Sequence, residues 1–322
     1  MSAGSSTLST FDGAASAVLQ PASQAAGQSA LQPASPSELQ PEQPTSQPLP
    51  ELVAELDERL ATIAAAHVRV KLATSMAAED MVLTHAILSG GFKIGIFTLE
   101  TGRLHAETLG MLDRVRERYS YEIEAFRPDP AAVQVYVETY GLNAFYESVE
   151  LRKACCGIRK VEPLNRALAG VEAWVTGQRR EQSVTRAELH HSEHDAARNI
   201  EKYNPLADWT EADVWAYLNA FDVPVNPLHA RGYPSIGCEP CTRAIRPGED
   251  SRAGRWWWES RDSKECGLHV ASAGPEDAVT VQTSEAPTDV AAVSTLPSSA
   301  IASDSASHAA VSDLFSTRTK QQ

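Results

Sequence analysis

The fold of this chain is decided by residues 68–99, which read VRVKLATSMAAEDMVLTHAILSGGFKIGIFTL. The two apolar runs at its ends, 68–74 and 93–99, have the length and composition of buried strands. Between them, a short loop leads into helical periodicity over 80–88, which ends at a Gly-Gly pair. A strand, a helix and a second strand in this order predict a parallel βαβ unit.

The same alternation continues on both sides of this unit. Upstream, apolar residues at helical spacing predict a helix over 51–67. Downstream, the expected elements are helices near 103–118, 130–140 and 211–221, and strands at 121–126 and 171–176. Strands that alternate with helices predict an α/β fold with a doubly wound, mostly parallel sheet. Ligands of such sheets bind beyond the carboxyl ends of the strands, where Ser75, 98–102 and Gly177 are expected to lie.

Composition divides the 322 residues into three parts. Residues 1–50 contain no Lys or Arg and are rich in Ser, Ala, Gln and Pro, and residues 271–322 consist mainly of Ala, Ser, Thr and Val with a few acids. We expect both tails to be disordered, because they cannot bury enough apolar surface to offset an ordering cost of about 1–2 kcal/mol per residue. Residues 51–270 then form one domain, in which 222–270 is largely irregular and ends in a mobile arm.

The net charge of −14 is shared between the tails and the domain. The tails hold nine acidic and two basic residues, so the domain carries −7, which argues against a nucleic-acid partner. No signal peptide and no apolar run of membrane-spanning length is visible. We therefore expect a cytoplasmic protein without a membrane partner, whose reduced cysteines serve as ligands or catalysts.

Two series of basic residues flank the cysteines, one over 152–186 and the other over 243–264. Any single arginine is better explained as solvated surface charge. Two series around the same cysteines favour an anion-binding pocket.

The five cysteines form three groups. Cys155 and Cys156 are adjacent, and Cys238 and Cys241 form a Cys-x-x-Cys. Four soft sulfur ligands in two tight pairs predict a metal site, either an iron–sulfur cluster or zinc, and the adjacent pair is atypical of zinc. Cys266 stands alone in the string KECGLH, where neighbouring cations favour its thiolate. It is therefore a candidate nucleophile, although a surface thiol of no consequence has the same local sequence.

Three loops are candidates for nucleotide contacts. Residues 75–80 join a strand to a helix start, which favours phosphate but also describes an ordinary capped helix. Residues 98–103 follow the next strand and could equally form a plain turn. Over 174–181, a strand leads into Gly177 and two arginines, which favours close backbone approach and bonds to an oxyanion over a solvated turn.

Two other clusters, one of histidines and one of tryptophans, are not assigned a chemical role. The three histidines over 190–194 are better explained by a polar helix or loop than by a metal site. The three tryptophans at 256–258 are better explained by packing than by base stacking.

Taken together, four strings resemble the motifs of assimilatory adenylyl-sulfate reductases. They are ACCGIRKVEPL at 154–164, GQRREQS at 177–183, NPLADW at 204–209 and GYPSIGCEPCTR at 232–243. The string ECGLH at 265–269 resembles the catalytic motif of the same family. The resemblance covers about 55–270 and neither tail.

The resemblance implies a fold of the adenine-nucleotide alpha-hydrolase-like (PP-loop) type and the reduction of adenosine 5′-phosphosulfate to sulfite and AMP, for cysteine biosynthesis. It implies a 4Fe-4S cluster on Cys155, Cys156, Cys238 and Cys241, with Cys266 as the nucleophile. Electrons come from thioredoxin through a transient mixed disulfide, and thioredoxin must be a separate protein because 271–322 contains no cysteine. The expected substrate-binding residues are Ser75, Thr98, Leu99, Lys160, Gly177, Arg252, Arg255 and His269.

The chain departs from related nucleotide-binding loops at one place. Met76 and Ala77 stand where those loops have glycines, which fits a reductase that need not hold a triphosphate. Two alternatives stay open: a 3′-phosphoadenylyl-sulfate reductase with an unusual cluster, and a non-catalytic nucleotide-binding protein with a zinc Cys₄ site. The sequence also leaves open whether copies of the chain form a homo-oligomer.

Overall fold

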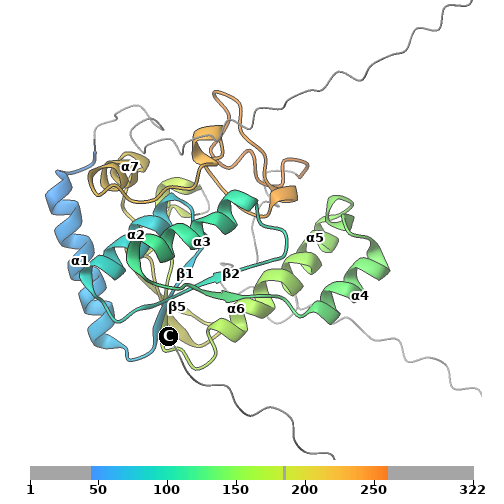
Figure 1. Ribbon diagram of the computed structural model, residues 1–322, viewed down its shortest axis with the longest axis horizontal. Helices are drawn as coiled ribbons and strands as arrows, with labels where there is room; N and C mark the ends of the chain where they lie inside the picture. The colour runs from blue at the N-terminus through green and yellow to red at the C-terminus, as the bar shows by residue number, and fades with distance from the viewer. Residues whose placement is uncertain (1–44, 184–185, 260–322) are drawn as a thin grey trace, which may run out of the picture. The chain divides into compact units, whose positions relative to one another are not determined.

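The computed structural model describes residues 45–183 and 186–259, which contain a six-stranded sheet of order β3-β2-β1-β4-β6-β5 (Figure 1). The strands are β1 (Val70–Thr74), β2 (Gly95–Leu99), β3 (Glu124–Phe126), β4 (Ala173–Val175), β5 (Ser192–Asp195) and β6 (Ile200–Tyr203). All neighbouring pairs are parallel except β5 with β6. The strand order reverses between β1 and β4, so the expected doubly wound, mostly parallel α/β fold is confirmed.

Helices cover both faces of this sheet. One layer contains α1 (Leu49–Ala66), α2 (Ala78–Gly90), α3 (Ala106–Tyr119) and α7 (Glu211–Ala220), and α6 (Glu162–Ala167) belongs to the other. Successive strand residues point to opposite layers: Ile96 joins the first core, whereas Phe97 joins the second together with Trp174. The central strands β2 and β4 are therefore covered on both sides, whereas the edge strands β3 and β5 are partly exposed.

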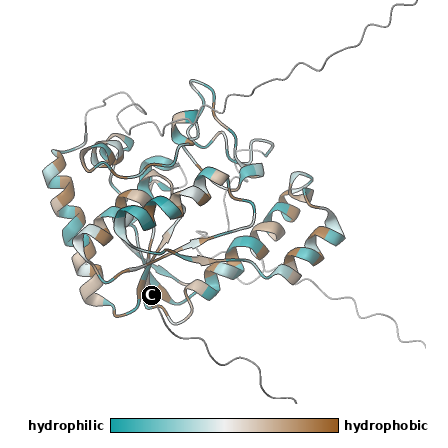
Figure 2. Cartoon of the chain, viewed as in Figure 1, coloured by the Kyte–Doolittle hydropathy of each residue, from teal (hydrophilic) through white to brown (hydrophobic). Residues whose placement is uncertain are grey.

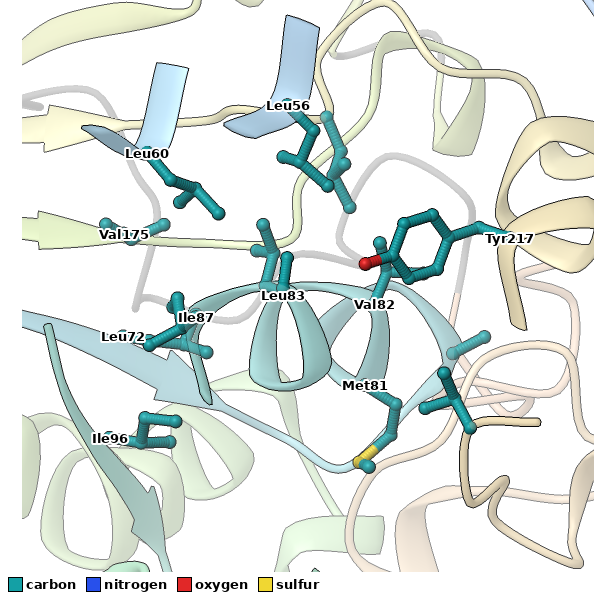
Figure 3. Close-up of a cluster of buried hydrophobic side chains, with 14 of the residues drawn as sticks. Leu56, Leu60, Leu72, Met81, Val82, Leu83, Ile87, Ile96, Val175 and Tyr217 are labelled. Atoms are coloured by element: carbon teal, nitrogen blue, oxygen red, sulfur yellow. The ribbon is translucent and has the colours of Figure 1, made fainter. Parts of the chain in front are cut away.

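The larger core explains why 68–99 dominates the fold. Figure 3 shows Leu56 and Leu60 of α1 facing Val82 and Leu83 of α2, and all four are fully buried. Burying one such side chain stabilises the fold by about 1.5–3 kcal/mol. Hydrophilic residues occur among the hydrophobic ones along α1 (Figure 2), because its other face is exposed.

Three helical elements between 149 and 167 were not predicted. They are α5 (Val149–Cys156), the π-helical turn η3 (Gly157–Val161) and α6, and they follow one another without a break. Figure 1 shows α4 (Pro130–Tyr140), which was predicted, beside α5. A π-helical turn inside a helix is rare and common at functional sites.

The expectation of a polar helix or loop over 190–194 is confirmed for His190 and His191, which lie in a loop, and is wrong for 192–194, which belong to β5. His194 lies in β5, the antiparallel edge strand, and its Nδ1 is 3.3 Å from Glu201 Oε1 of β6. His191 Nε2 is instead 3.4 Å from Asp208 Oδ2. The histidines are therefore separate and form no metal trio among the described residues.

The segment 222–259 is as irregular as expected, with two short 3₁₀ helices, η6 (His229–Arg231) and η7 (Glu239–Cys241), as its helices. The predicted disordered tails, apart from 45–50, and the predicted arm with Cys266 and His269 lie outside the described residues. None of the helices within 45–183 and 186–259 combines the length and hydropathy that a bilayer span needs.

Candidate functional site

A cavity of about 280 Å³ lies where the carboxyl ends of β1, β2 and β4 meet. It brings together seven of the eight residues expected to bind substrate, from segments up to 180 positions apart in the sequence. They are Ser75, Thr98, Leu99, Lys160, Gly177, Arg252 and Arg255. The topology of the sheet therefore gathers the strand-end residues as expected.

The loop after β1 is held by a buried carboxylate. The Ser75 backbone N–H and hydroxyl both donate to Asp80 Oδ2, each at 2.6 Å. Burial raises the pKa of Asp80 to about 6, against the opposing effect of hydrogen bonds from Ser75 and the Gly177 backbone. Met76, in a position where related loops have glycine, takes the left-handed conformation with φ of 61° and is buried.

Gly177 is required by close packing. A Cβ atom at this position would lie 2.3 Å from Asp80 Oδ1 and 3.0 Å from Glu79 Cβ. The backbone after β4 thus approaches the start of α2 more closely than any side chain permits, and one carboxylate connects the two loops.

The two arginines after Gly177 do not serve as the expected oxyanion ligands. Arg179 is buried in ion pairs with Glu79, at 2.9 Å, and Glu181, at 2.8 Å. Burial alone would raise the pKa of Glu79, but the Arg179 charge and the hydrogen bonds to the carboxylate together outweigh burial, and the pKa is lowered. The Arg180 Nε donates to the Leu189 carbonyl at 2.8 Å. Both side chains therefore hold the structure around the cavity.

Besides Arg179 and Arg186, three cations line the cavity: Lys160 from η3, and Arg252 and Arg255 from the irregular segment. The Arg255 guanidinium lies 4.6 Å from the ring centre of Trp256 and donates to the Ile236 carbonyl at 3.1 Å. Its Nε is buried and has no hydrogen-bond partner among the described residues. This end of the cavity is suited to an anionic group.

The four cysteines that were expected to bind a cluster line a second, small cavity of about 20 Å³. Cys155 and Cys156 end α5, while Cys238 directly precedes η7 and Cys241 is its last residue. The Cys238 Sγ lies 3.3 Å from the Thr101 hydroxyl oxygen. Burial raises the pKa of Cys155, although hydrogen bonding and charge from Arg159 oppose it.

The arrangement of these sulfurs fits a polynuclear cluster better than a single ion. Among the described residues, no three Cys, His, Asp or Glu side chains are close enough together to share one metal ion. Adjacent residues of a helix, such as Cys155 and Cys156, do not point in one direction. A 4Fe-4S cluster takes one thiolate at each of four irons, so its ligands surround a cage.

The two cavities share part of their walls. Lys160, Cys238 and Trp256 line both of them. A group bound to the cysteines would therefore be next to the cationic end of the larger cavity.

Sequence reasoning missed His229, which lines the larger cavity. Glu79, Asp80, Thr101 and Gln178 line it too, but the candidate loops at 75–80, 98–103 and 174–181 included them without a role of their own. Gln178 Oε1 and His229 Nε2 are buried and have no hydrogen-bond partner among the described residues. The parts played by Glu79 and Asp80 could have been anticipated from their place as acids in the first turn of α2, next to Ser75. His229 had no local signal, because its place depends on the path of an irregular segment.

The raised pKa of Asp80 predicts a pH-dependent stability. An unfolded Asp titrates near 3.9, whereas the folded group titrates at about 6. The stability that this group contributes is thus fully present below about pH 4 and is lost as the pH rises through 6. We expect the free energy of unfolding of wild type minus that of D80N to fall between about pH 4 and pH 6.5 and to stay level above this, as measured by urea denaturation. A difference that rises over this interval would contradict the buried, charged state of Asp80.

Comparisons with known proteins show the family to which this chain is similar. A model of the phosphoadenosine phosphosulfate reductase domain matches residues 69–244. A Burkholderia cepacia protein named adenosine 5′-phosphosulfate reductase is 78% identical over 229 residues, which are 70% of this chain and 92% of that relative. A Neisseria meningitidis protein of the same name is 57% identical over 222 residues, 69% of this chain and 91% of that relative.

A solved structure shares the fold. The crystal structure of phosphoadenylyl-sulfate reductase from Candida auris, in a phosphate complex, aligns with a TM-score of 0.51 and 23% identity. The alignment covers 63% of this chain and 98% of the Candida auris chain. The expected PP-loop type of fold is thus confirmed, and the resemblance drawn from the motifs is confirmed by the high-identity relatives.

Proposed function

Because this chain belongs to the phosphoadenosine phosphosulfate reductase family, we propose that it reduces adenosine 5′-phosphosulfate to sulfite and AMP. The observation that carries the proposal is the larger cavity, which combines strand-end loops with three cations and adjoins the four cysteines. The nucleotide portion of the substrate needs the strand-end loops, and its phosphosulfate needs the cations.

Ser75, Thr98, Leu99 and Gly177 bind the adenosine portion at the strand ends. Lys160, Arg252 and Arg255 bind the phosphosulfate. Charge-assisted bonds from these cations reduce the repulsion that a thiolate meets when it approaches an anion. His269, which follows Cys266 by three residues in the sequence, favours the thiolate form of that cysteine.

A methyl group at Gly177 is expected to weaken nucleotide binding. The added Cβ of G177A would overlap Asp80 Oδ1, and relieving this overlap costs about 1–3 kcal/mol. We expect the affinity for AMP to fall about tenfold by calorimetry. G110A is the matched control, because no atom outside the helix backbone lies within 4 Å of its Cβ in α3, and it should retain the wild-type affinity. Equal affinities for the two variants would contradict a nucleotide site at Gly177.

The first chemical step forms a covalent intermediate. The Cys266 Sγ attacks the sulfur of the phosphosulfate, the bond from that sulfur to the bridging phosphate oxygen breaks, and AMP leaves with the electron pair. A thiosulfonate, Cys–S–SO₃⁻, remains on the chain. Covalent catalysis replaces one hard reduction with two easier displacements.

The second step releases sulfite. A thioredoxin thiolate attacks Cys266 Sγ, the sulfur–sulfur bond to the sulfonate breaks, and sulfite departs with that electron pair. The second cysteine of thioredoxin then resolves the mixed disulfide. Thioredoxin loses two electrons, and Cys266 returns to the thiolate.

Cys155, Cys156, Cys238 and Cys241 would hold a 4Fe-4S cluster. When bound, the cluster supplies a fixed electrostatic and structural centre beside the phosphosulfate. The chain's own part is to keep this centre buried and to hold Lys160 between it and the substrate, since Lys160 lines both cavities.

The proposal is tested by sulfite release with reduced thioredoxin. We expect anaerobically purified, brown protein to turn over adenosine 5′-phosphosulfate much faster than its 3′-phosphorylated form. Preference for the phosphorylated nucleotide would favour the alternative reductase. Binding of both nucleotides without sulfite release would favour a non-catalytic protein.

A further inference from the structure

A buried ion pair lies at the root of the segment that carries Cys266. Glu259 is the last residue before the undescribed segment, and both of its carboxylate oxygens accept from Arg152, at 2.7 and 3.0 Å. The side chains are only 1% and 3% exposed for Arg152 and Glu259. The pair joins the start of the arm to α5, the helix that ends in Cys155 and Cys156.

A strained tryptophan lies in the same connection. Trp256 takes a left-handed backbone conformation with φ of 41°, which is unusual for a bulky residue, and it is 1% exposed. Its ring contacts two guanidinium groups, with Arg152 at 4.7 Å and Arg255 at 4.6 Å from the ring centre. The surrounding contacts thus hold a conformation that the residue alone would avoid.

Backbone bonds complete this connection. The Trp256 N–H donates to the Cys241 carbonyl at 3.1 Å, and the Glu259 N–H donates to the Trp256 carbonyl at 2.9 Å. The turn at 256–259 is therefore attached to both cysteine-bearing segments, and through Arg255 to the larger cavity. Cys266 follows Glu259 by seven residues, which span at most about 25 Å when extended.

We propose that the Arg152–Glu259 pair is a positioning device, which fixes the root of the arm so that Cys266 reaches the substrate sulfur. The inference rests on the proposed function, in which Cys266 is the nucleophile. Neither residue lines the larger cavity, so neither is expected to contact the nucleotide, whereas Arg152 does line the small cavity of the cysteines. Their effect is on the rate of thiosulfonate formation, because small displacements of a reacting group cost up to about 100-fold in rate.

Three variants test the device. E259Q removes one charge. R152M/E259M removes both charges of the pair, so neither Arg152 nor Glu259 remains buried without the other, and it should retain the fold better than a single replacement. E249Q is the matched control, since the Arg243–Glu249 pair, at 2.8 Å, lies in the same irregular segment but makes no link to α5.

The measurement is a single turnover with ³⁵S-labelled adenosine 5′-phosphosulfate at saturation and without reductant, alongside iron content and AMP affinity. We expect E259Q and R152M/E259M to label Cys266 about 10–100-fold more slowly than wild type, with unchanged AMP affinity. E259Q leaves Arg152 in the wall of the cysteine cavity, so its iron content should also be unchanged. E249Q should label at the wild-type rate.

Wild-type labelling by either variant would overturn the proposal. Loss of iron from both variants would also overturn it, because the pair would then support the cysteine helix rather than the arm. An unlabelled wild-type protein would contradict the proposed function itself, so the two failures are distinguishable.

Discussion

Substitution C266S is expected to abolish sulfite release from adenosine 5′-phosphosulfate while leaving AMP binding and iron content unchanged. The serine hydroxyl is a far weaker nucleophile than a thiolate, and loss of a catalytic nucleophile costs roughly 10⁴-fold or more in rate. The measurements are sulfite release with reduced thioredoxin, AMP calorimetry and visible absorbance.

The control for C266S is C266A, which should behave in the same way. Residual sulfite release by both variants above the rate without protein would mean that another group attacks the sulfur. A loss of colour in both would mean that Cys266 belongs to the metal site rather than to the chemistry.

Substitution C238S is expected to remove both the colour and most of the activity. Cys238 is buried, lies against the Thr101 hydroxyl and lines both cavities, so its loss affects the cluster and the cationic end together. Serine oxygen is a poor ligand for an iron–sulfur cluster. We expect the absorbance at about 400 nm to disappear and turnover to fall by roughly 100-fold or more. Substitution of residues that only support a metal ligand already lowers metal affinity or activity by about 10–100-fold.

Metal analysis of the same samples separates the cluster from zinc. The cluster proposal predicts iron and inorganic sulfide in wild type and their loss in C238S. A colourless wild-type protein that holds zinc and reduces the substrate would contradict the proposal. Retention of iron by C238S would exclude Cys238 as a ligand.

The sequence predicted the strand-end half of the site because chain direction alone decides it. Parallel strands place their carboxyl ends at one edge, so Ser75, Thr98 and Gly177 had to meet there once the strands were recognised. The apolar runs that form β1 and β2 are long and bounded, which made these strands easy to recognise.

Contacts between distant parts of the chain were not predictable in the same way. The ion pair of Arg179 with Glu79 joins residues 100 positions apart, and that of Arg152 with Glu259 joins residues 107 apart. In each pair, an arginine of the series that was expected to bind an anion instead stabilises the fold. Neither periodicity nor a motif predicts which distant glutamate such an arginine contacts.

Local patterns also failed where polarity hid the secondary structure. The edge strand β5 reads Ser-Glu-His-Asp and is half exposed, so it lacks the apolar alternation of a strand. Residues 149–167 contain charges and two cysteines, and the π-helical turn η3 interrupts the helical period between α5 and α6.

The central claim is tested most directly by mass analysis of the protein after a single turnover without thioredoxin. The account predicts that one AMP is released for each sulfonate group gained, that the sulfonate lies on the peptide containing Cys266, and that sulfite appears only after reduced thioredoxin is added. Sulfite release before any thiol is added, or a sulfonate on another residue, would contradict it.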